Sequence, residues 1–237
     1  LPGDYYKTKR QDYHDVELRG IFNFTDNSNT VFGTDYRYET LDRPESDLNK
    51  GLGTFSVYGQ HEQRLAGHLT LLAGLRYDLH QEIGSRLTPK VALMYNKGNF
   101  NARATYAAGY RTPGIDELYY HMLKPMGSRH IITFGNRDLK AENSNFGSIN
   151  VEYRTSRLTV SLTGYLNFVK NMVTSRSTKF SAMSESEQAA LIAEFPEIND
   201  IKTSTLSVKE YYNFSKATVK GIEANLSFNP IVGLTLS

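Results

Sequence analysis

The residue types that most often carry out reactions are either missing from this chain or lie without the partners that a reaction needs. There is no cysteine among the 237 residues, which excludes disulfide scaffolds, zinc knuckles and thiol catalysis. The chain has no Gly-x-Gly-x-x-Gly, no phosphate-binding loop and no Gly-x-Ser-x-Gly, and its acidic residues form no evident acid–base couple. We therefore do not expect an enzyme.

Two histidines are the best candidates for binding chemistry, because an imidazole nitrogen can ligate a metal centre. Both lie in a long polar stretch, 111–145, and aromatic and thioether side chains surround them in the sequence. The residues of this candidate set are Tyr119, Tyr120, His121, Met122, Met126 and His130.

The elements that must position these side chains are indicated by alternation of apolar and polar residues with a period of two. The alternation is clearest over 16–24, 69–79, 100–110 and 158–168, and the apolar set of 100–110 runs from Phe100 to Tyr110 on even numbers. These runs are nine to eleven residues long, which is the length of a tilted membrane strand. Soluble strands average only about 5–6 residues. Weaker alternation marks further strands near 31–39, 54–62, 88–95, 146–153 and 216–228.

The spacers between these strands fall into two classes that alternate along the chain. Short spacers rich in Gly, Asn, Asp or Pro, which suit tight turns, lie at 25–29, 64–67, 96–99, 154–157 and 229–233. The others are polar and mostly long, at 41–53, 80–87, 111–145 and 171–210. The pattern predicts an all-β fold, an antiparallel up-and-down transmembrane β-barrel with an apolar outer face, of which this chain supplies about ten strands. A soluble antiparallel sandwich also alternates and is the alternative.

Composition is compatible with such a barrel. The longest apolar runs, Val91–Tyr95 and Ala189–Ala193, are five residues long, whereas a membrane helix needs roughly 18. The 27 basic and 25 acidic residues leave a net charge of +2, which gives no argument for a nucleic-acid partner. One helix is expected inside the last long spacer, because Ser184 and Glu187 fit a capping box and Pro196 stops the run.

Two sequence boxes resemble those of TonB-dependent outer-membrane receptors. The family has an aromatic-Arg-Ala-Pro box followed by Asn-Pro-Asp-Leu-Lys-Pro-Glu, and this chain reads Tyr-Arg-Thr-Pro at 110–113 and Asn-Arg-Asp-Leu-Lys-Ala-Glu at 136–142. The segments 57–60, 73–78, 89–93 and 220–224 also match pieces of the family in the family's order. Thr112, Arg137 and Ala141 depart from the family pattern. The motif residues carried over are Tyr110, Arg111, Pro113, Asn136, Asp138 and Leu139.

The resemblance implies an outer-membrane receptor of a Gram-negative bacterium that binds a scarce metal chelate and imports it with energy supplied by TonB. We expect residues 1–237 to form part of a single barrel domain, with the plug domain and the TonB-contact segment outside this chain. The implied partners are TonB through that plug, outer-membrane lipid and the chelate, and a surface lipoprotein is an optional further partner. No intrinsic cofactor is expected. Arg76, Asp78 and Arg103 are expected on the inner face, where they pair with one another across strands; pairing with the plug is the alternative.

Haem is the favoured cargo under this resemblance, because haem-uptake members carry a histidine between the two boxes and histidine ligates haem iron. His121 or His130 would be the axial ligand, and Tyr119, Tyr120, Met122 and Met126 would pack on the porphyrin face or supply a soft axial contact. Aromatic residues also line cobalamin and siderophore pockets, so a cobalamin or siderophore receptor is the alternative. A passive porin shares the alternation but is not expected to carry the paired boxes.

Overall fold

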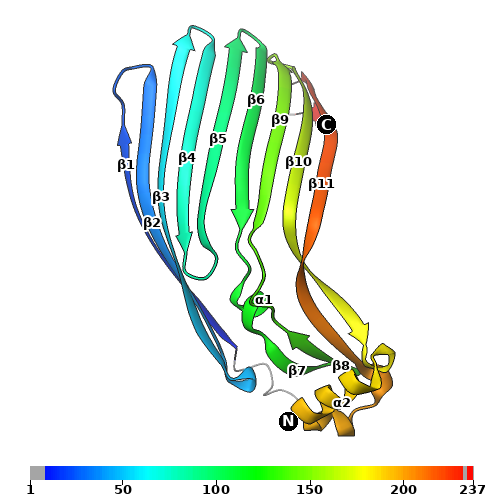
Figure 1. Ribbon diagram of the computed structural model, residues 1–237. Coiled ribbons are helices and arrows are strands. Elements are labelled where there is room, and N and C mark those ends of the chain that lie inside the picture. The colour runs from blue at the N-terminus through cyan, green and yellow to red at the C-terminus, as the bar shows by residue number, and fades with distance from the viewer. Residues whose placement is uncertain (1–8, 232–233, 237) are drawn as a thin grey trace.

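The computed structural model describes residues 9–231 and 234–236. They form one 12-stranded sheet, curved and twisted like a segment of a barrel wall (Figure 1). Neighbouring strands of the main meander are antiparallel and follow the order β1-β2-β3-β4-β5-β6-β9-β10-β11. Their bounds are β1 Arg10–Phe22, β2 Ser28–Arg43, β3 Leu48–Ala66, β4 Leu69–His80, β5 Gly84–Lys97, β6 Phe100–Arg111, β9 Glu142–Arg154, β10 Leu158–Lys179 and β11 Leu206–Ile231.

Tight turns join the strands at one end of the wall, and longer insertions gather at the other end (Figure 1). In the turn between β5 and β6, Gly98 has a φ of +56°, a conformation that glycine adopts without steric cost. The insertions contain helix α1 (Ile115–Tyr119), a hairpin of β7 (His121–Met126) and β8 (Arg129–Phe134), and helix α2 (Glu185–Glu194). The short strand β12 (Leu234–Leu236) pairs with β11, and residues 232–233 of the last expected turn lie outside the described residues.

The predicted alternation is confirmed by the exposure of the wall residues. The apolar sets lie on the outward face, where Val16, Leu162 and Ile222 are 70%, 53% and 79% exposed. Near the short turns this face carries a row of exposed aromatic side chains: Phe22, Phe24, Tyr95, Phe100, Tyr153 and Phe228. An outward apolar band bounded by aromatic rings is typical of transmembrane barrels. Among the described residues, no helix is both long and apolar enough to span a membrane.

The inner face carries the charges that were expected there. Arg76 bonds Asp78 through Nε at 2.8 Å and Asp35 through Nη1 at 2.7 Å. Its Nη2 also donates to the Ser56 hydroxyl at 2.7 Å. Arg76 therefore pairs with Asp78 as expected, but within β4, and its partner on another strand is Asp35 of β2. Arg103 does not join this cluster and instead places Nη2 3.1 Å from the sulfur of Met94.

Several predicted spacers are wrong in extent, because the strands continue well past the apolar band. β2 reaches Arg43 and β3 begins at Leu48, so most of the 41–53 spacer is strand around the short turn Pro44–Ser46. Likewise β10 continues to Lys179 and β11 begins at Leu206, inside the expected 171–210 spacer. In these extensions Leu41, Leu48 and Leu52 are buried in a local core, so the outward face carries no continuous apolar row and the period-two signal fades.

Tyr110 corrects the predicted alternation at the end of β6. The alternation predicts an outward side chain at this even-numbered position, but Tyr110 lines an inner hollow beside Arg76, Asp78 and His80. The ladder between β5 and β6 stops at the pair Lys90 and Ala107. Beyond that pair β6 no longer has β5 as a neighbour, so the side chain of Tyr110 is not held on the outward face.

The long-loop end has buried cores of its own. A first cluster joins Leu41, Leu48, Leu52, Ile115, Leu118 and Leu139, and a second joins Ile132, Phe180, Leu191, Ile198, Leu206 and Val208. The second cluster forms because β8 pairs in parallel with the first residues of β11, from His130 opposite Leu206 to Phe134 opposite Glu210. We call the segments 112–141 and 180–205, with the strand ends that they cover, the loop assembly.

Candidate functional site

The two family boxes fold into one clasp at the end of β6. Arg111 of the first box bonds Glu142 of the second at 2.6 Å and Glu117 of α1 at 2.8 Å. Glu117 also accepts the backbone N–H of Gly114 at 2.9 Å, and Glu142 accepts that of Val173 at 2.9 Å. A guanidinium forked between two carboxylates is a strong, directional contact. The clasp therefore fixes α1 against β9 and β10.

The remaining motif residues support this clasp. Pro113 is fully buried and Leu139 packs in the first core cluster. Asn136 donates from Nδ2 to the carbonyl of Tyr211 at 3.1 Å and accepts the N–H of Asp138 at 2.9 Å. These contacts give the motif residues a positioning role for the segment that follows α1, which contains the candidate ligand residues.

Tyr119 and Tyr120 are held by different partners at the end of α1. Tyr120 accepts a hydrogen bond from Nη1 of Arg43 at 3.0 Å. Tyr119 donates to Oε1 of Glu82 at 2.7 Å. Burial, and then the hydrogen bond to the Glu82 carboxylate, raise the pKa of the Tyr119 hydroxyl. It is therefore a protonated donor at neutral pH.

Cations surround the ring of Tyr119. Lys50 Nζ and Arg137 Cζ lie 5.4 Å and 5.3 Å from the ring centroid, within reach of a cation–π attraction. A hollow of about 140 Å³ opens beside the ring, and its charged lining is Arg86, Arg137, Lys140 and Glu82. We call Lys50, Arg86, Arg137 and Lys140 with Tyr119 the cationic cluster. With one carboxylate against four cations, it attracts an anion.

His121 and His130 lie at opposite ends of the β7–β8 hairpin. His121 pairs with Phe134 and His130 with Pro125, the first and fifth of the six residue pairs. Both side chains project to the same face as Ile132, which is buried in the second core cluster. The two histidines therefore face the segment that carries α2.

The two rings differ in their surroundings. Nε2 of His121 lies 2.7 Å from Oε1 of Glu194, and its ring stacks on Phe195 at 5.2 Å between centroids. Nδ1 of His130 is buried and has no hydrogen-bond partner among the described residues. A haem iron would have to displace Glu194 to reach Nε2 of His121.

The two methionines of the candidate set are also separated. Met122 is 4% exposed, whereas Met126 at the hairpin tip is 54% exposed. Among the described residues, no group of three or more His, Asp or Glu side chains is arranged to hold a metal ion. The structure thus brings Tyr119 together with cations that the sequence did not single out, and it places the histidines at the ends of a hairpin packed against α2.

Comparison with known proteins places this wall and its loop assembly in a known architecture. Residues 2–237 match the family model "TonB dependent receptor-like, beta-barrel". The siderophore receptor PirA from Pseudomonas aeruginosa has a similar structure, with a TM-score of 0.71 and 21% identity over 96% of this chain and 39% of that one.

Two further solved structures have the same fold. A variant of the ferric enterobactin receptor PfeA from Pseudomonas aeruginosa, in complex with enterobactin, gives a TM-score of 0.71 and 19% identity over 96% of this chain and 34% of that one. A double mutant of the Serratia marcescens hemophore receptor HasR, in complex with HasA and heme, gives a TM-score of 0.67 and 14% identity over 93% and 40%. The chain spans well under half the length of these proteins.

Proposed function

Because the chain belongs to the TonB-dependent receptor β-barrel family, whose members are transporters and not enzymes, we propose that it is part of an outer-membrane receptor of a Gram-negative bacterium. The receptor binds an anionic metal chelate at the long-loop end and imports it with energy supplied by TonB. The observation that carries the choice of ligand is the cationic cluster around Tyr119.

The chemistry of the cluster fits a ferric siderophore. Arg137 and Lys140 are exposed at the inner mouth of the wall, where a carboxylate or catecholate oxygen can reach them. Charge-assisted hydrogen bonds of this kind are about twice as strong as neutral ones. Tyr119 adds an aromatic face. PirA and PfeA, which the chain resembles in fold, are named as receptors for a siderophore and for ferric enterobactin.

Haem is the second candidate. It is supported by Nδ1 of His130, which has no hydrogen-bond partner in the described part of the chain, and by the position of His121 between the two boxes. Haem also carries anionic carboxylates, so the cationic cluster alone does not separate the two cargoes. In the haem case, an imidazole ligates the iron. Tyr119, Tyr120, Met122 and Met126 would then contact the porphyrin. Cobalamin stays a candidate only through the family.

The test uses the full-length receptor with its plug. Ferric enterobactin and haem are titrated against wild type, an Arg137→Gln/Lys140→Gln variant and a His121→Ala/His130→Ala variant. For a siderophore receptor we expect the first variant to weaken ferric enterobactin binding by about tenfold or more, since each lost charge-assisted bond costs about 1.5–3 kcal/mol. The histidine variant should bind ferric enterobactin as wild type does.

The haem alternative predicts the reverse, a lost Soret shift and weaker haem binding in the histidine variant. Arg154→Gln, at the short-turn end of β9, is the matched control and should change neither titration. Iron uptake from the better ligand should stop in cells that lack TonB. If neither chelate binds, or if uptake continues unchanged without TonB, the proposed function is wrong.

A further inference from the structure

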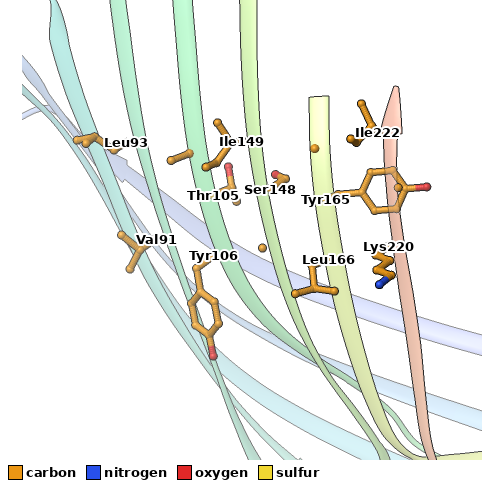
Figure 2. A pocket seen from close by; sticks show the side chains of 14 residues that line it. Val91, Leu93, Thr105, Tyr106, Ser148, Ile149, Tyr165, Leu166, Lys220 and Ile222 are labelled. Carbon is orange, nitrogen blue, oxygen red and sulfur yellow. The ribbon is translucent and has the colours of Figure 1, made fainter. Parts of the chain in front are cut away.

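The two faces of the wall carry hollows that differ in chemistry. The outward one, with a volume of about 1070 Å³, has an apolar lining that includes Leu93, Ile149 and Ile222 (Figure 2). An inner hollow of about 360 Å³ is instead lined mostly by charged and polar side chains. His80, the last residue of β4, lines this inner hollow and is only 6% exposed. The charge state of this imidazole therefore depends on the protein groups around it.

The ring of His80 holds the turn between β4 and β5. Its Nδ1 accepts the backbone N–H groups of Glu82 and Ile83, both at 3.2 Å. Gln81 is fixed differently, because its N–H donates to the carbonyl of Gly53 at 3.0 Å and its Oε1 accepts the N–H of Gly53 at 3.1 Å. The second half of the turn therefore depends on the imidazole, whereas Gln81 is attached to β3.

This turn forms one side of the ligand hollow beside Tyr119. Glu82 and Ile83 line that hollow, and Oε1 of Glu82 accepts the Tyr119 hydroxyl at 2.7 Å. Among the described residues of the lining, Glu82 alone carries a carboxylate. A Glu82 carboxylate released from Tyr119 would be free to pair with Arg137 or Lys140, and it would then compete with an anionic chelate for these cations.

Only the neutral ring of His80 can hold the turn. A neutral imidazole accepts at one nitrogen, whereas both nitrogens of the protonated ring donate. Protonation would therefore place an N–H of the ring against the N–H groups of Glu82 and Ile83, and both hydrogen bonds would be lost.

His80 lies beyond the lipid-facing band of the wall. It is the last of the 12 residues of β4, whose first residue, Leu69, pairs with Tyr95 of the aromatic row. At the usual rise and tilt of barrel strands, His80 is about 28 Å from that row, whereas an apolar band is about 25 Å tall. Burial lowers the pKa of the His80 ring, against an opposing effect of the Glu82 and Glu39 carboxylates. The two hydrogen bonds are therefore complete above the ordinary pKa of about 6.5 and are lost as the pH falls through the lower folded value.

The inner hollow offers acceptors to a protonated ring. Oδ2 of Asp78 is buried and has no hydrogen-bond partner among the described residues, and Glu39 of β2 lines the same hollow. The other charged or titratable groups of this lining are Tyr13, Asp35, Arg37, Arg76, Tyr110 and Arg111. Each of these three arginines already pairs with a carboxylate. A charged His80 can therefore leave the turn for a carboxylate of the hollow.

We propose that His80 is a positioning residue of the ligand hollow. Its neutral ring holds Glu82 on Tyr119 and so keeps Arg137 and Lys140 available to the chelate. Protonation of the ring at acid pH opens the turn and weakens chelate binding. This role rests on the proposed function for its ligand, whereas the opening of the turn is a property of the protein alone.

The experiment combines hydrogen exchange with chelate titration on the full-length receptor, from about pH 8 to about pH 4.5, a range that spans the ordinary pKa of histidine. At the upper pH, His80→Ala should speed exchange at the amides of Glu82 and Ile83 by roughly tenfold or more, for two lost hydrogen bonds. The amide of Gln81 should stay protected. Binding of ferric enterobactin, or of haem if that is the chelate bound, should weaken by roughly fivefold or more.

His80→Asn is the conservative variant, because an asparagine side chain accepts a backbone N–H two residues further on and does not titrate. It should keep the wild-type exchange and affinity at the upper pH and should lack the loss that the wild type shows at acid pH. Comparing the variants at each pH removes any titration of the chelate itself. His68→Ala, in the short turn between β3 and β4, is the matched control and should follow the wild type throughout.

Equal pH profiles of the wild type and His80→Asn would overturn the proposal, and so would unchanged exchange at Glu82 and Ile83 in His80→Ala. A receptor that binds its chelate equally well in every variant would overturn the role of His80 alone and leave the proposed function standing. A wild type that binds neither chelate would instead overturn the proposed function, and exchange at the two amides would still decide whether His80 holds the turn.

Discussion

The wall and the loop assembly differ in the exposure of their apolar side chains. In the loop assembly, Ile132 is 0% exposed and belongs to a closed core. In the wall, Ile149 is 64% exposed on the outward face. Nearly every fully buried apolar side chain of the described residues lies at the long-loop end, and Ala92 is the exception within the wall.

This contrast indicates that one sheet is stabilised in two environments, water at the loop assembly and lipid around the wall. The loop assembly depends on the hydrophobic effect in water. The wall instead satisfies its backbone groups through a continuous ladder and leaves its apolar side chains to lipid. The same substitution should therefore have different consequences in the two regions.

The largest effect is expected from Ile132→Ala in the loop assembly. Removing a fully buried isoleucine side chain costs about 2–5 kcal/mol through lost burial and the cavity left behind. Hydrogen exchange of the full-length receptor should show faster exchange in β8 and α2, with the wall unchanged. The matched variant Ile149→Ala should change exchange very little. Equal effects of the two variants would contradict the division into two regions.

A charged side chain on the outward face should destabilise the wall, although truncation to alanine at the same position does not. Ile149→Arg is expected to destabilise the wall by about 2–4 kcal/mol in a bilayer, the cost of a cation near the middle of the lipid-facing band. Denaturant unfolding in lipid vesicles measures this change. At Ile132 both the alanine and the arginine substitution should be destabilising, because this side chain is buried in a closed core. If Ile149→Arg unfolds as readily as Ile149→Ala, the outward face is not a lipid surface.

The clasp between the two regions should give a smaller effect. Arg111→Lys keeps the charge but loses the fork between Glu117 and Glu142, and we expect a loss of about 1 kcal/mol because the guanidinium is partly exposed. Glu117 and Glu142 accept the backbone N–H groups of Gly114 and Val173. Hydrogen exchange at these two amides therefore reports the opening of the clasp. Arg154→Lys, in an exposed pair with Glu152 at the short-turn end, serves as the control and should have no effect there.

The smallest effect concerns the N-terminus of α2, where Ser184 and Glu187 form the expected capping box. Hydrogen bonds from the Ser184 hydroxyl and N–H lower the pKa of the Glu187 carboxyl. Its stabilisation is present above the unfolded pKa of about 4.3 and is lost as the pH falls through the lower folded value. Exchange in α2, corrected for the intrinsic rate, should quicken below that pH in wild type. Glu187→Gln should show no such step.

The wall could be predicted from sequence because its physics is local. Two-residue alternation reports which face meets lipid, and Val16 and Leu162 lie where the pattern put them. The capping box of α2 is equally local and is confirmed. Tyr110 was misplaced because its side chain depends on where the neighbouring strand stops, and no pattern within β6 carries that information.

The cationic cluster was missed for the same reason. Lys50, Arg86 and Arg137 come from three separated parts of the chain and meet only after the wall curves and the clasp closes. The one available signal was Arg137, which replaces the proline of the family box. In the sequence Arg137 is only a departure from the family pattern. In the structure its guanidinium lies over the ring of Tyr119, which makes it a candidate ligand contact.

The parallel pairing of β8 with β11 has a consequence for the order of folding. From β1 to β6, each strand pairs with the next one along the chain through a short connection, so hairpins can form one after another with little loop-closure entropy. The β8–β11 pair joins His130 to Leu206, across two strands and a helix, and contacts so distant in sequence form slowly. We expect the wall to assemble first and the loop assembly to close over it last, so a receptor newly inserted in the membrane would pass through a stage with its wall complete and its ligand site not yet built.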